Sequence, residues 1–285
     1  MTSRSGAGPA SLLPAALVAA PVLVGVIYAA GAATGVWGVG ASGTFDLSRS
    51  IEVLGSAVVV EGTLWTLWIG AATTVLSALI AAALALAFRA SDRFGRWGRT
   101  LAVLPLPVPH LVGAVAALLI LGQSGLLARL AYALGWIAGP GDMPALVQDR
   151  AGIGMIMALL WKEIPFLFLV ASSVLATRGE ALEGAARRLG ASRWQTLRRV
   201  TWPLLWRGML PACVAVFTFV VGTWEVAALL APSDPLALPL ITYERYVDSD
   251  LARRPDAFVV ALVGMAIAVV AVGVHEVGTR WRGRP

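Results

Sequence analysis

The chain has 285 residues, of which 58% are hydrophobic and only 13% charged, and its formal net charge is +6. This composition excludes an ordinary soluble domain and indicates an all-α protein that crosses a membrane several times. One cysteine, Cys213, excludes an internal disulfide bond, and no Cys/His cluster suggests a metal site. The positive charge does not indicate nucleic-acid binding, because the arginines alternate between segments in the way that membrane loops do.

Six apolar segments are each close to the length of about 20 residues that one helical bilayer crossing requires. They lie at about 11–34, 62–88, 101–121, 152–176, 208–230 and 257–278. The prediction is therefore one transmembrane domain over 1–285 with six helices. The first segment also has features of a cleaved signal peptide. Its apolar stretch exceeds the roughly 7–15 residues of such peptides, so we expect it to be retained.

Arginine placement sets the expected orientation, because cytoplasmic loops carry the excess of positive charge. With the N-terminus inside, the inner segments carry one arginine before the first span, four over 89–99, seven over 178–207 and three after the last span. The outer segments carry six. The chain is thus expected to be a multi-pass protein of the cell inner (plasma) membrane with both termini in the cytoplasm.

The third segment opens with prolines at 105, 107 and 109. Proline lacks a backbone N–H group and breaks a membrane helix locally, so neighbouring groups must satisfy the freed carbonyl oxygens. His110 directly follows these prolines. We expect it to be a packed, hydrogen-bonded histidine rather than a ligand for a solute or metal.

Three charged side chains within the later spans are candidates for a solute path: Lys162, Glu163 and Glu225. A charge at bilayer depth costs on the order of several kcal/mol unless it is paired or hydrated, so such residues are functional candidates. Lys162 and Glu163 are adjacent and point about 100° apart on a helix, so they do not pair on one face. An interhelical ion pair or a contact with a partner subunit is the alternative interpretation.

The only long, strongly basic polar stretch lies at 177–203. It is predicted to form two short helices joined by a turn. Gly190 stands where the C′ residue of the first helix would be, and Ser192 with Gln195 is a capping-box pattern for the second. Pro203 is expected to end that second helix.

Each of these two helices has a predicted apolar face. The first face is Leu182, Ala186 and Leu189, and the second is Trp194, Leu197 and Val200. Glu183 and Arg187 form an i,i+4 ion pair in the favourable order. A basic helix-turn-helix is also a DNA-binding pattern, but the apolar spans that closely flank this one leave no independent domain to reach a groove.

This stretch resembles the EAA loop of ABC importer permeases, whose pattern is Glu-Ala-Ala, three residues, Gly, nine residues and Ile-x-Leu-Pro. The matching segments here are Gly184-Ala185-Ala186, Gly190 and Val200-Thr201-Trp202-Pro203. Gly184 replaces the family's Glu, although Glu183 stands just before it. The resemblance implies a loop that couples to an ATPase through Glu183, Gly184, Ala185, Ala186, Gly190, Ala191, Ser192 and Pro203.

The same resemblance implies the type I ABC importer permease fold, with six transmembrane helices and no enzyme activity in this chain. It also implies the partners: two ABC ATPase subunits, a second permease that is identical or related, and an extracytoplasmic solute-binding protein. The chain contains no Gly-x-x-x-x-Gly-Lys-Ser/Thr sequence. ATP and Mg are therefore expected on the partner ATPase and not on this chain.

Two further segments, 104–109 and 122–127, resemble the branch of this family that serves polyamines, thiamine, iron and oxyanions. The fifth helices of the two permeases line the shared cavity in that family, which would place Glu225 near the outer mouth of the path. A carboxylate there favours a cation or a hydrogen-bond-donating solute over an oxyanion, so a polyamine or thiamine-like solute is the leading prediction, ahead of iron chelates and oxyanions.

Two other functions remain as alternatives. Gly122-Gln123-Ser124-Gly125 matches the Gly-x-Ser-Gly of rhomboid-type intramembrane proteases, and His275 lies in the last span. The predicted topology places these two residues at opposite membrane faces, which exceeds the reach of a serine–histidine hydrogen bond. The other alternative is a secondary transporter driven by an ion gradient.

Overall fold

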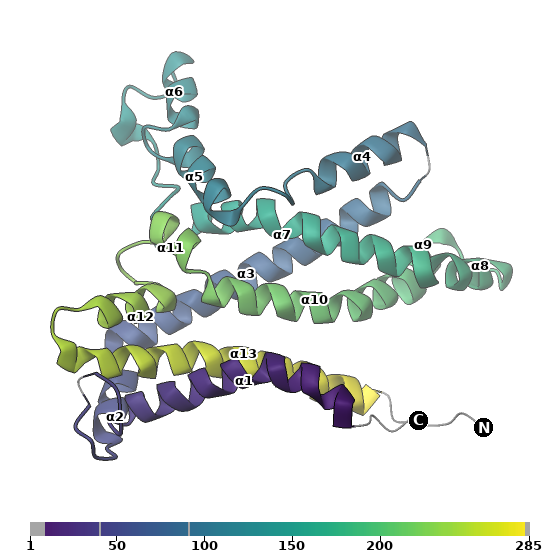
Figure 1. Ribbon diagram of the computed structural model, residues 1–285. Helices are drawn as coiled ribbons and strands as arrows, with labels where there is room; N and C mark the ends of the chain where they lie inside the picture. The colour runs from purple at the N-terminus through teal and green to yellow at the C-terminus, as the bar shows by residue number, and fades with distance from the viewer. Residues whose placement is uncertain (1–8, 40, 91, 283–285) are drawn as a thin grey trace. The chain divides into compact units, whose positions relative to one another are not determined.

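The computed structural model describes residues 9–39, 41–90 and 92–282, and this part of the chain contains helices and no strand (Figure 1). Six helices are long and apolar enough to cross a membrane: Ala16–Ala33, Ala57–Ala87, His110–Ala133, Ile153–Arg188, Arg193–Gly222 and Leu251–Thr279. The predicted all-α class with six membrane-spanning helices is confirmed. Arg4 and Arg284 of the charge pattern lie outside the described residues, as do the side chains of Arg280 and Arg282.

The described chain divides into two compact units, and the prediction of a single domain over 1–285 stays a prediction. The first unit comprises the described residues of Met1–Val60 and Ile241–Ala266. In it, α1 (Pro9–Ala33) and the first half of α13 (Arg254–Arg282) meet where the ring of Tyr28 packs edge-on against Phe258. The short α2 (Ser48–Gly55) is fixed by an ion pair of 2.5 Å between Arg49 Nε and Asp256 Oδ1.

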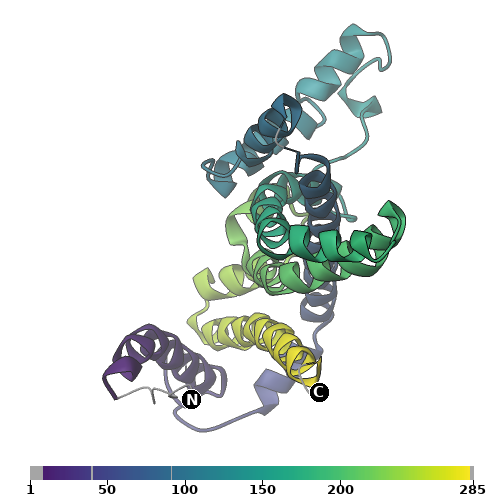
Figure 2. The same ribbon diagram turned by 90° about the vertical axis from the view of Figure 1, so that its right-hand side faces the viewer.

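The second unit, which holds all the candidate site residues, comprises the described residues of Glu61–Leu240 and Ile267–Pro285. Its core lies between α3 (Ala57–Ala87), α7 (Ile153–Val174) and α10 (Trp202–Gly222). Helices α7 and α10 lie side by side in both views (Figure 1 and Figure 2). Small residues permit this close approach, since a Cβ atom on Gly208 would lie 2.5 Å from the side chain of Val174.

The third predicted span is divided in two. Helix α4 (Arg93–Val103) occupies what was predicted to be a loop, and Asp92 caps it by accepting a hydrogen bond of 2.8 Å from Gly95 N. The chain then breaks over 104–109, and α5 (His110–Leu121) begins after the last of three prolines. The predicted start of this span at residue 101 is wrong, because prolines at three alternate positions remove N–H donors and prevent one continuous helix.

The fifth predicted span, 208–230, is also divided. Helix α10 ends at Gly222, Thr223 is extended with φ −73° and ψ 112°, and a separate short helix, α11 (Trp224–Leu230), follows. The prediction of one helix is therefore wrong over its last third. Glycine and threonine have low helix propensity, and α11 turns to pack against α5 and α7.

Polar contacts hold the loop before α7 in place within the second unit. Helix α6 (Leu126–Ala133) and the 3₁₀ turn η1 (Pro140–Asp142) precede a loop that returns to α7. Trp65 and Trp68 donate indole hydrogen bonds of 2.8 and 2.9 Å to the carbonyl oxygens of Arg150 and Ala151. Arg150 also forms an ion pair with Asp234. The remaining elements are α12 (Leu238–Val247) and the 3₁₀ turn η4 (Leu251–Arg253).

Candidate functional site

The basic stretch folds as a helical hairpin over residues 175–201, called the basic hairpin below. Helix α7 runs through a π-helical segment, η2 (Leu175–Gly179), into α8 (Glu180–Arg188). After a turn, α9 (Arg193–Thr196) runs through a second π-helical segment, η3 (Leu197–Thr201), into α10. The two arms of the basic hairpin are therefore continuous with two membrane-spanning helices.

The turn of the basic hairpin follows the sequence prediction closely. Gly190 has φ +86°, the left-handed conformation that glycine adopts without strain. Ala191 N donates to Ala186 O at 3.1 Å and Gly190 N donates to Arg187 O at 3.0 Å, which is the bonding pattern of a Schellman motif. Ser192 Oγ accepts from Gln195 N, and Gln195 Oε1 accepts from Ser192 N, so the predicted capping box is present.

The prediction that Pro203 ends the second helix is wrong. The helix passes through Pro203, which lies in the first turn of α10 directly after η3. A π-helical turn is wider than an α-helical turn and shifts the hydrogen-bond pattern by one residue. This shift accommodates a residue that has no N–H group and whose ring needs space beside the preceding turn.

Three apolar residues of the basic hairpin point away from its core, whereas Leu197 and Val200 of the second predicted face are half-buried. Leu182 is 47% exposed, Leu189 89% and Trp194 67%, whereas Glu183, Thr196 and Thr201 are buried. Leu182 and Leu189 of the first predicted face form an outer surface, and Ala186 of the same face is half-buried. Exposed apolar side chains gathered at one turn are typical of a surface that a partner covers.

The predicted coupling residues divide between an outer and an inner group. Ala185, Gly190 and Ser192 are exposed, and Ala186 and Ala191 are half-buried. A Cβ atom on Gly184 would meet nothing within 4 Å, so the missing Glu leaves open space beside α8. Their role in coupling stays a prediction.

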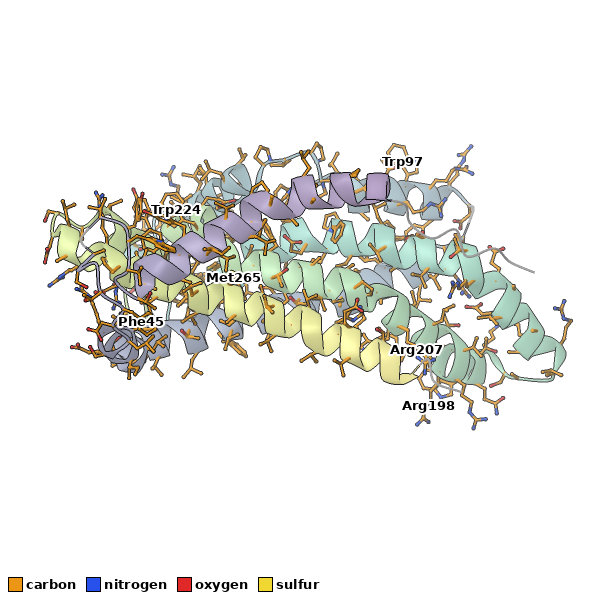
Figure 3. The ribbon with its side chains drawn as sticks, turned by 60° about the horizontal axis from the view of Figure 1, so that its bottom comes forward. Phe45, Trp97, Arg198, Arg207, Trp224 and Met265 are labelled. Carbon is orange, nitrogen blue, oxygen red and sulfur yellow. The ribbon has the colours of Figure 1, made fainter. Side chains whose placement is uncertain are left out.

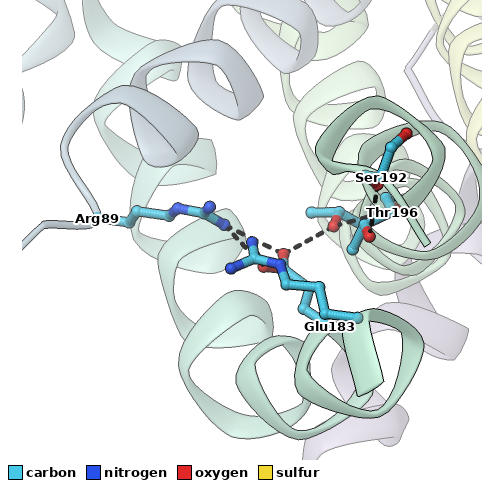
Figure 4. A network of polar contacts seen from close by, with 6 residues as sticks. Arg89, Glu183, Ser192 and Thr196 are labelled. Carbon is cyan, nitrogen blue, oxygen red and sulfur yellow. Dashed lines mark hydrogen bonds and ion pairs between the residues drawn. The ribbon is translucent and has the colours of Figure 1, made fainter. Parts of the chain in front are cut away.

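Glu183 is only 8% exposed and is the centre of a polar network (Figure 4). Arg89 Nη1 lies 3.1 Å from both carboxylate oxygens, and Arg187 Nη2 lies 3.4 Å from Oε2. Thr201 donates its hydroxyl hydrogen bond to Oε1 at 2.7 Å. The pair with Arg187 was predicted from spacing. Arg89, 94 residues away, and Thr201 were not, because no local pattern indicates them.

Two clefts flank this network. One, of about 690 Å³, is lined by Ala85, Phe88, Arg89, Ala90, Arg99, Ser172, Leu175, Ala176, Gly179, Glu180, Glu183, Gly184 and Arg187. The other, of about 460 Å³, is lined by Leu86, Arg89, Glu183, Arg187, Arg193, Thr196, Leu197 and Thr201. The basic hairpin thus meets the end of α3 across open space, with charged side chains between them.

Arginines of the basic hairpin and of the segment after α3 gather at the hairpin end of the second unit, whereas Arg150 lies at the other end with Asp234. In Figure 3, Arg198, Arg207 and Trp97 lie at that end, and Trp224 lies at the opposite end of the helices. The ion pair between Arg89 and Glu183 places the basic segment after α3 beside the basic hairpin. Two segments that the charge pattern assigned to the same side of a membrane therefore do lie together.

Lys162 lies beside the proline break and satisfies its carbonyl groups. Its Nζ donates to Pro105 O at 2.8 Å, to Leu106 O at 3.3 Å and to Val108 O. An ammonium group has three N–H donors, and three backbone acceptors face this one. The neighbour that the freed carbonyls required is thus a buried lysine on α7.

Glu163 points away from Lys162, and its Oε1 atom lies 3.1 Å from Nε2 of His110. The His110 ring packs 4.7 Å, centre to centre, from that of Phe219 on α10. A cavity of about 330 Å³ here is lined by Leu106, His110, Lys162, Glu163, Phe166, Ala215, Val216 and Phe219. Lys162 and Glu163 do not pair with each other, as predicted, and each already has a partner. His110 is packed and hydrogen-bonded, as expected.

Glu225 lies elsewhere, in the first turn of α11, and does not line this cavity. Within the described residues its carboxylate has no hydrogen-bond or ion-pair partner, and it is half-buried. Ser124 lies between α5 and α6, His275 lies on α13, and no hydrogen bond joins the two in the part of the chain that the structure covers. The three candidate path residues are thus not one cluster, and no protease dyad is formed.

Comparison with known proteins gives the same family that the basic hairpin suggests. Residues 75–276 match the family described as "Binding-protein-dependent transport system inner membrane component". The molybdenum transport system permease protein ModB of Mycobacterium tuberculosis is 31% identical over 215 residues, which cover 74% of this chain and 75% of ModB. A probable molybdenum ABC transporter permease of Haloferax volcanii is 32% identical over 180 residues, covering 63% of this chain and 60% of that protein.

A solved bacterial ABC transporter involved in the import of the acidic polysaccharide alginate has the same fold. One of its chains matches with a TM-score of 0.72 over 96% of this chain and 98% of that one, at 17% identity. At this identity the likeness concerns the fold alone. With the match over 75–276, it shows that the chain belongs to the family of binding-protein-dependent transport system inner membrane components and has the fold of an ABC importer permease.

Proposed function

We propose that the chain is the membrane-spanning permease subunit of an ATP-driven ABC importer for a small oxyanion such as molybdate. The observation that carries the transport role is the basic hairpin, which joins two membrane-spanning helices and exposes Leu182, Leu189 and Trp194 at its turn. The support for an oxyanion comes from relatives whose names specify molybdenum. They give no support to the polyamine or thiamine-like solute that Glu225 suggested.

The proposed assembly contains this chain, a second permease that is identical or related, two ABC ATPase subunits and an external solute-binding protein. ATP and Mg would bind to the ATPases, which would dock on the outer surface of the basic hairpin. Closure of the ATPases would move the hairpin, and the continuous helices α7 and α10 would carry that movement into the membrane. In one solved structure of similar fold, an alginate transporter is in complex with a periplasmic protein.

ATP dependence tests this function directly. Proteoliposomes that hold the purified assembly and an external binding protein should take up radiolabelled molybdate only when ATP is enclosed. Vanadate should stop this uptake, and an ionophore that collapses ion gradients should leave it unchanged. The opposite pattern, with uptake that follows the ion gradient and ignores ATP, would establish a secondary transporter instead.

The orientation has its own test by cysteine labelling of intact cells. In cells that lack the ATPase, we expect Asp142→Cys and Asp250→Cys to react with a membrane-impermeant maleimide from outside, and Leu189→Cys to react only after the cells are opened. The natural Cys213 is buried and is replaced by alanine to remove background. Leu189 is preferable to Gly190 because Gly190 adopts a positive φ. Labelling of position 189 from outside would contradict a cytoplasmic hairpin.

The solute class is tested at Glu225. For an oxyanion, Glu225→Gln removes a repelling charge, so molybdate uptake should stay equal or rise by about two- to threefold, equivalent to ~0.5 kcal/mol. For a cationic solute the same change should lower uptake of spermidine or thiamine while the ATPase still docks. Competition for uptake among molybdate, sulfate, spermidine and thiamine is the measurement, and inhibition by the cations alone would reject the oxyanion proposal.

A further inference from the structure

The carboxylate of Glu183 connects three separate parts of the second unit. It receives Arg89 from the segment after α3, Arg187 from α8 and the hydroxyl group of Thr201 from η3, at distances from 2.7 to 3.4 Å. The carboxylate is buried, and charge-assisted hydrogen bonds of this kind are the stronger ones in proteins. Both its oxygen atoms have partners within the chain.

These partners leave Glu183 unavailable to a docking protein. A group that contacts an ATPase must be accessible, as Leu189 is at 89% exposure, whereas Glu183 is 8% exposed. The acidic residue of this segment therefore faces inward, and the apolar residues face outward. Glu183 lies on α8 and Leu189 directly follows that helix, so one short segment has a buried charge on its inner side and an exposed apolar side chain on its outer side.

The surroundings of this charged contact combine an apolar core with two open clefts. Clefts of about 690 Å³ and 460 Å³ lie on the two sides of Glu183, and both Arg89 and Glu183 line each of them. Ala85 near the end of α3 and Leu175 at the start of η2 belong to the same buried core, so apolar packing joins these two segments. The contact from the end of α3 to α8 is the ion pair between Arg89 and Glu183, whose residues line both clefts. Helix α3 is also not continuous with either arm of the hairpin, unlike α7 and α10.

We infer that Glu183 is a positioning residue that ties the basic hairpin to the end of α3 through Arg89, so that movement of the hairpin is passed to α3 as well as to α7 and α10. This inference rests on the proposed function, because the movement is the one that an ATPase would impose. Without the ion pair, the hairpin still binds the ATPase, but ATP hydrolysis no longer moves α3. The expected defect is therefore in coupling and not in assembly.

The central variant is Glu183→Gln, which keeps the size of the side chain and an acceptor for Thr201 but removes the charge that binds both arginines. We expect the amount of co-purified ATPase to stay within twofold of the wild type. The number of ATP molecules hydrolysed per solute imported should rise at least fivefold. Glu180→Gln is the matched control, because Glu180 is exposed on the same helix, and it should leave that ratio unchanged.

Arg89→Gln provides a second, independent variant for the case in which Glu183→Gln fails to fold or to insert in the membrane. Arg89 is half exposed, and its loss leaves Glu183 with Arg187 and Thr201. It should raise the same ratio at least fivefold. The double variant should be no worse than Glu183→Gln alone, since both variants remove the ion pair between Arg89 and Glu183. Additive effects, or an unchanged ratio in Arg89→Gln, would overturn the inference, as would loss of ATPase binding in Glu183→Gln alone.

A readout on the permease alone separates this inference from the proposed function. Hydrogen exchange of the backbone amides over 175–201 should be at least tenfold faster in Glu183→Gln and Arg89→Gln than in Glu180→Gln, while the core of α7 is unchanged. If exchange rises in both variants but even the wild type shows no ATP-driven uptake, the proposed function fails, whereas the link between the hairpin and α3 through Arg89 and Glu183 is supported. If uptake is ATP-driven but exchange is unchanged in both variants, the proposed function stands and the inferred link through Arg89 and Glu183 is rejected.

Discussion

Leu189→Asp is expected to abolish binding of the ATPase while the permease remains folded and inserted in the membrane. The side chain is 89% exposed, so the isolated chain loses almost no packing. In the docked assembly the change removes the burial of a leucine, about 1.5–3 kcal/mol, and adds the desolvation of a charge. Together these exceed ~3 kcal/mol, which lowers affinity by about a hundredfold or more. Co-purification and titration of the ATPase measure the effect.

Leu134→Asp is the matched control for this prediction. Leu134 is 53% exposed directly after α6, which the proposed topology places on the outer side of the membrane. The same chemical change there should leave ATPase binding at the wild-type level. Normal ATPase binding in Leu189→Asp would show that the outer surface of the basic hairpin is not the docking surface.

Lys162→Met is expected to give the largest loss of stability among single changes in the membrane-spanning part. It leaves the carbonyl groups of Pro105, Leu106 and Val108 without their shared donor at the break between α4 and α5. Each unsatisfied buried acceptor costs about 1–3 kcal/mol. The expected result is a Tm lower by several degrees and a large loss of uptake, measured by thermal unfolding in detergent and by transport.

The same experiment distinguishes this structural role from a role in binding the solute. If Lys162 binds a passing oxyanion, Lys162→Met should leave Tm unchanged and raise the KM for uptake. Trp161→Phe serves as the control, because Trp161 is the exposed neighbour on the same helix. An unchanged Tm in Lys162→Met would therefore contradict the capping of the proline break by this lysine.

Local rules predicted the parts of the hairpin whose conformation is determined by neighbours in sequence. Gly190, Ser192 and Gln195 adopt their turn and capping roles within three to five residues, so spacing was sufficient. Hydropathy was sufficient for the six spans because each one must be apolar over its whole length. The helix end at Pro203 was placed wrongly, since a π-helical turn carries the helix through it. The span start at 101 was also placed wrongly, because the prolines break the helix over 104–109, and the donor for the freed carbonyls comes from Lys162, which is distant in sequence.

Periodicity also cannot tell which way an apolar face points. Leu182 and Leu189 share a face, as predicted, but spacing does not indicate whether that face meets a core or a partner. The contact between Glu183 and Arg89 joins residues 94 positions apart, and it depends on how two helix ends meet in space. Such contacts follow from tertiary packing, so a single sequence gives no local signal for them.

The two π-helical segments determine the direction in which the basic hairpin faces. Each corresponds to one extra residue inserted into an otherwise α-helical arm, and one residue turns everything beyond it by about 100°. The direction in which Leu189 points therefore depends on the number of residues in η2 and η3, and not on which side chains these segments carry. Deletion of one residue from η2 or η3 alone would rotate one arm relative to the other and strain the turn. Deletion of one residue from both would rotate the whole turn without that mismatch. The number of residues in each arm therefore sets the orientation of the turn that joins them.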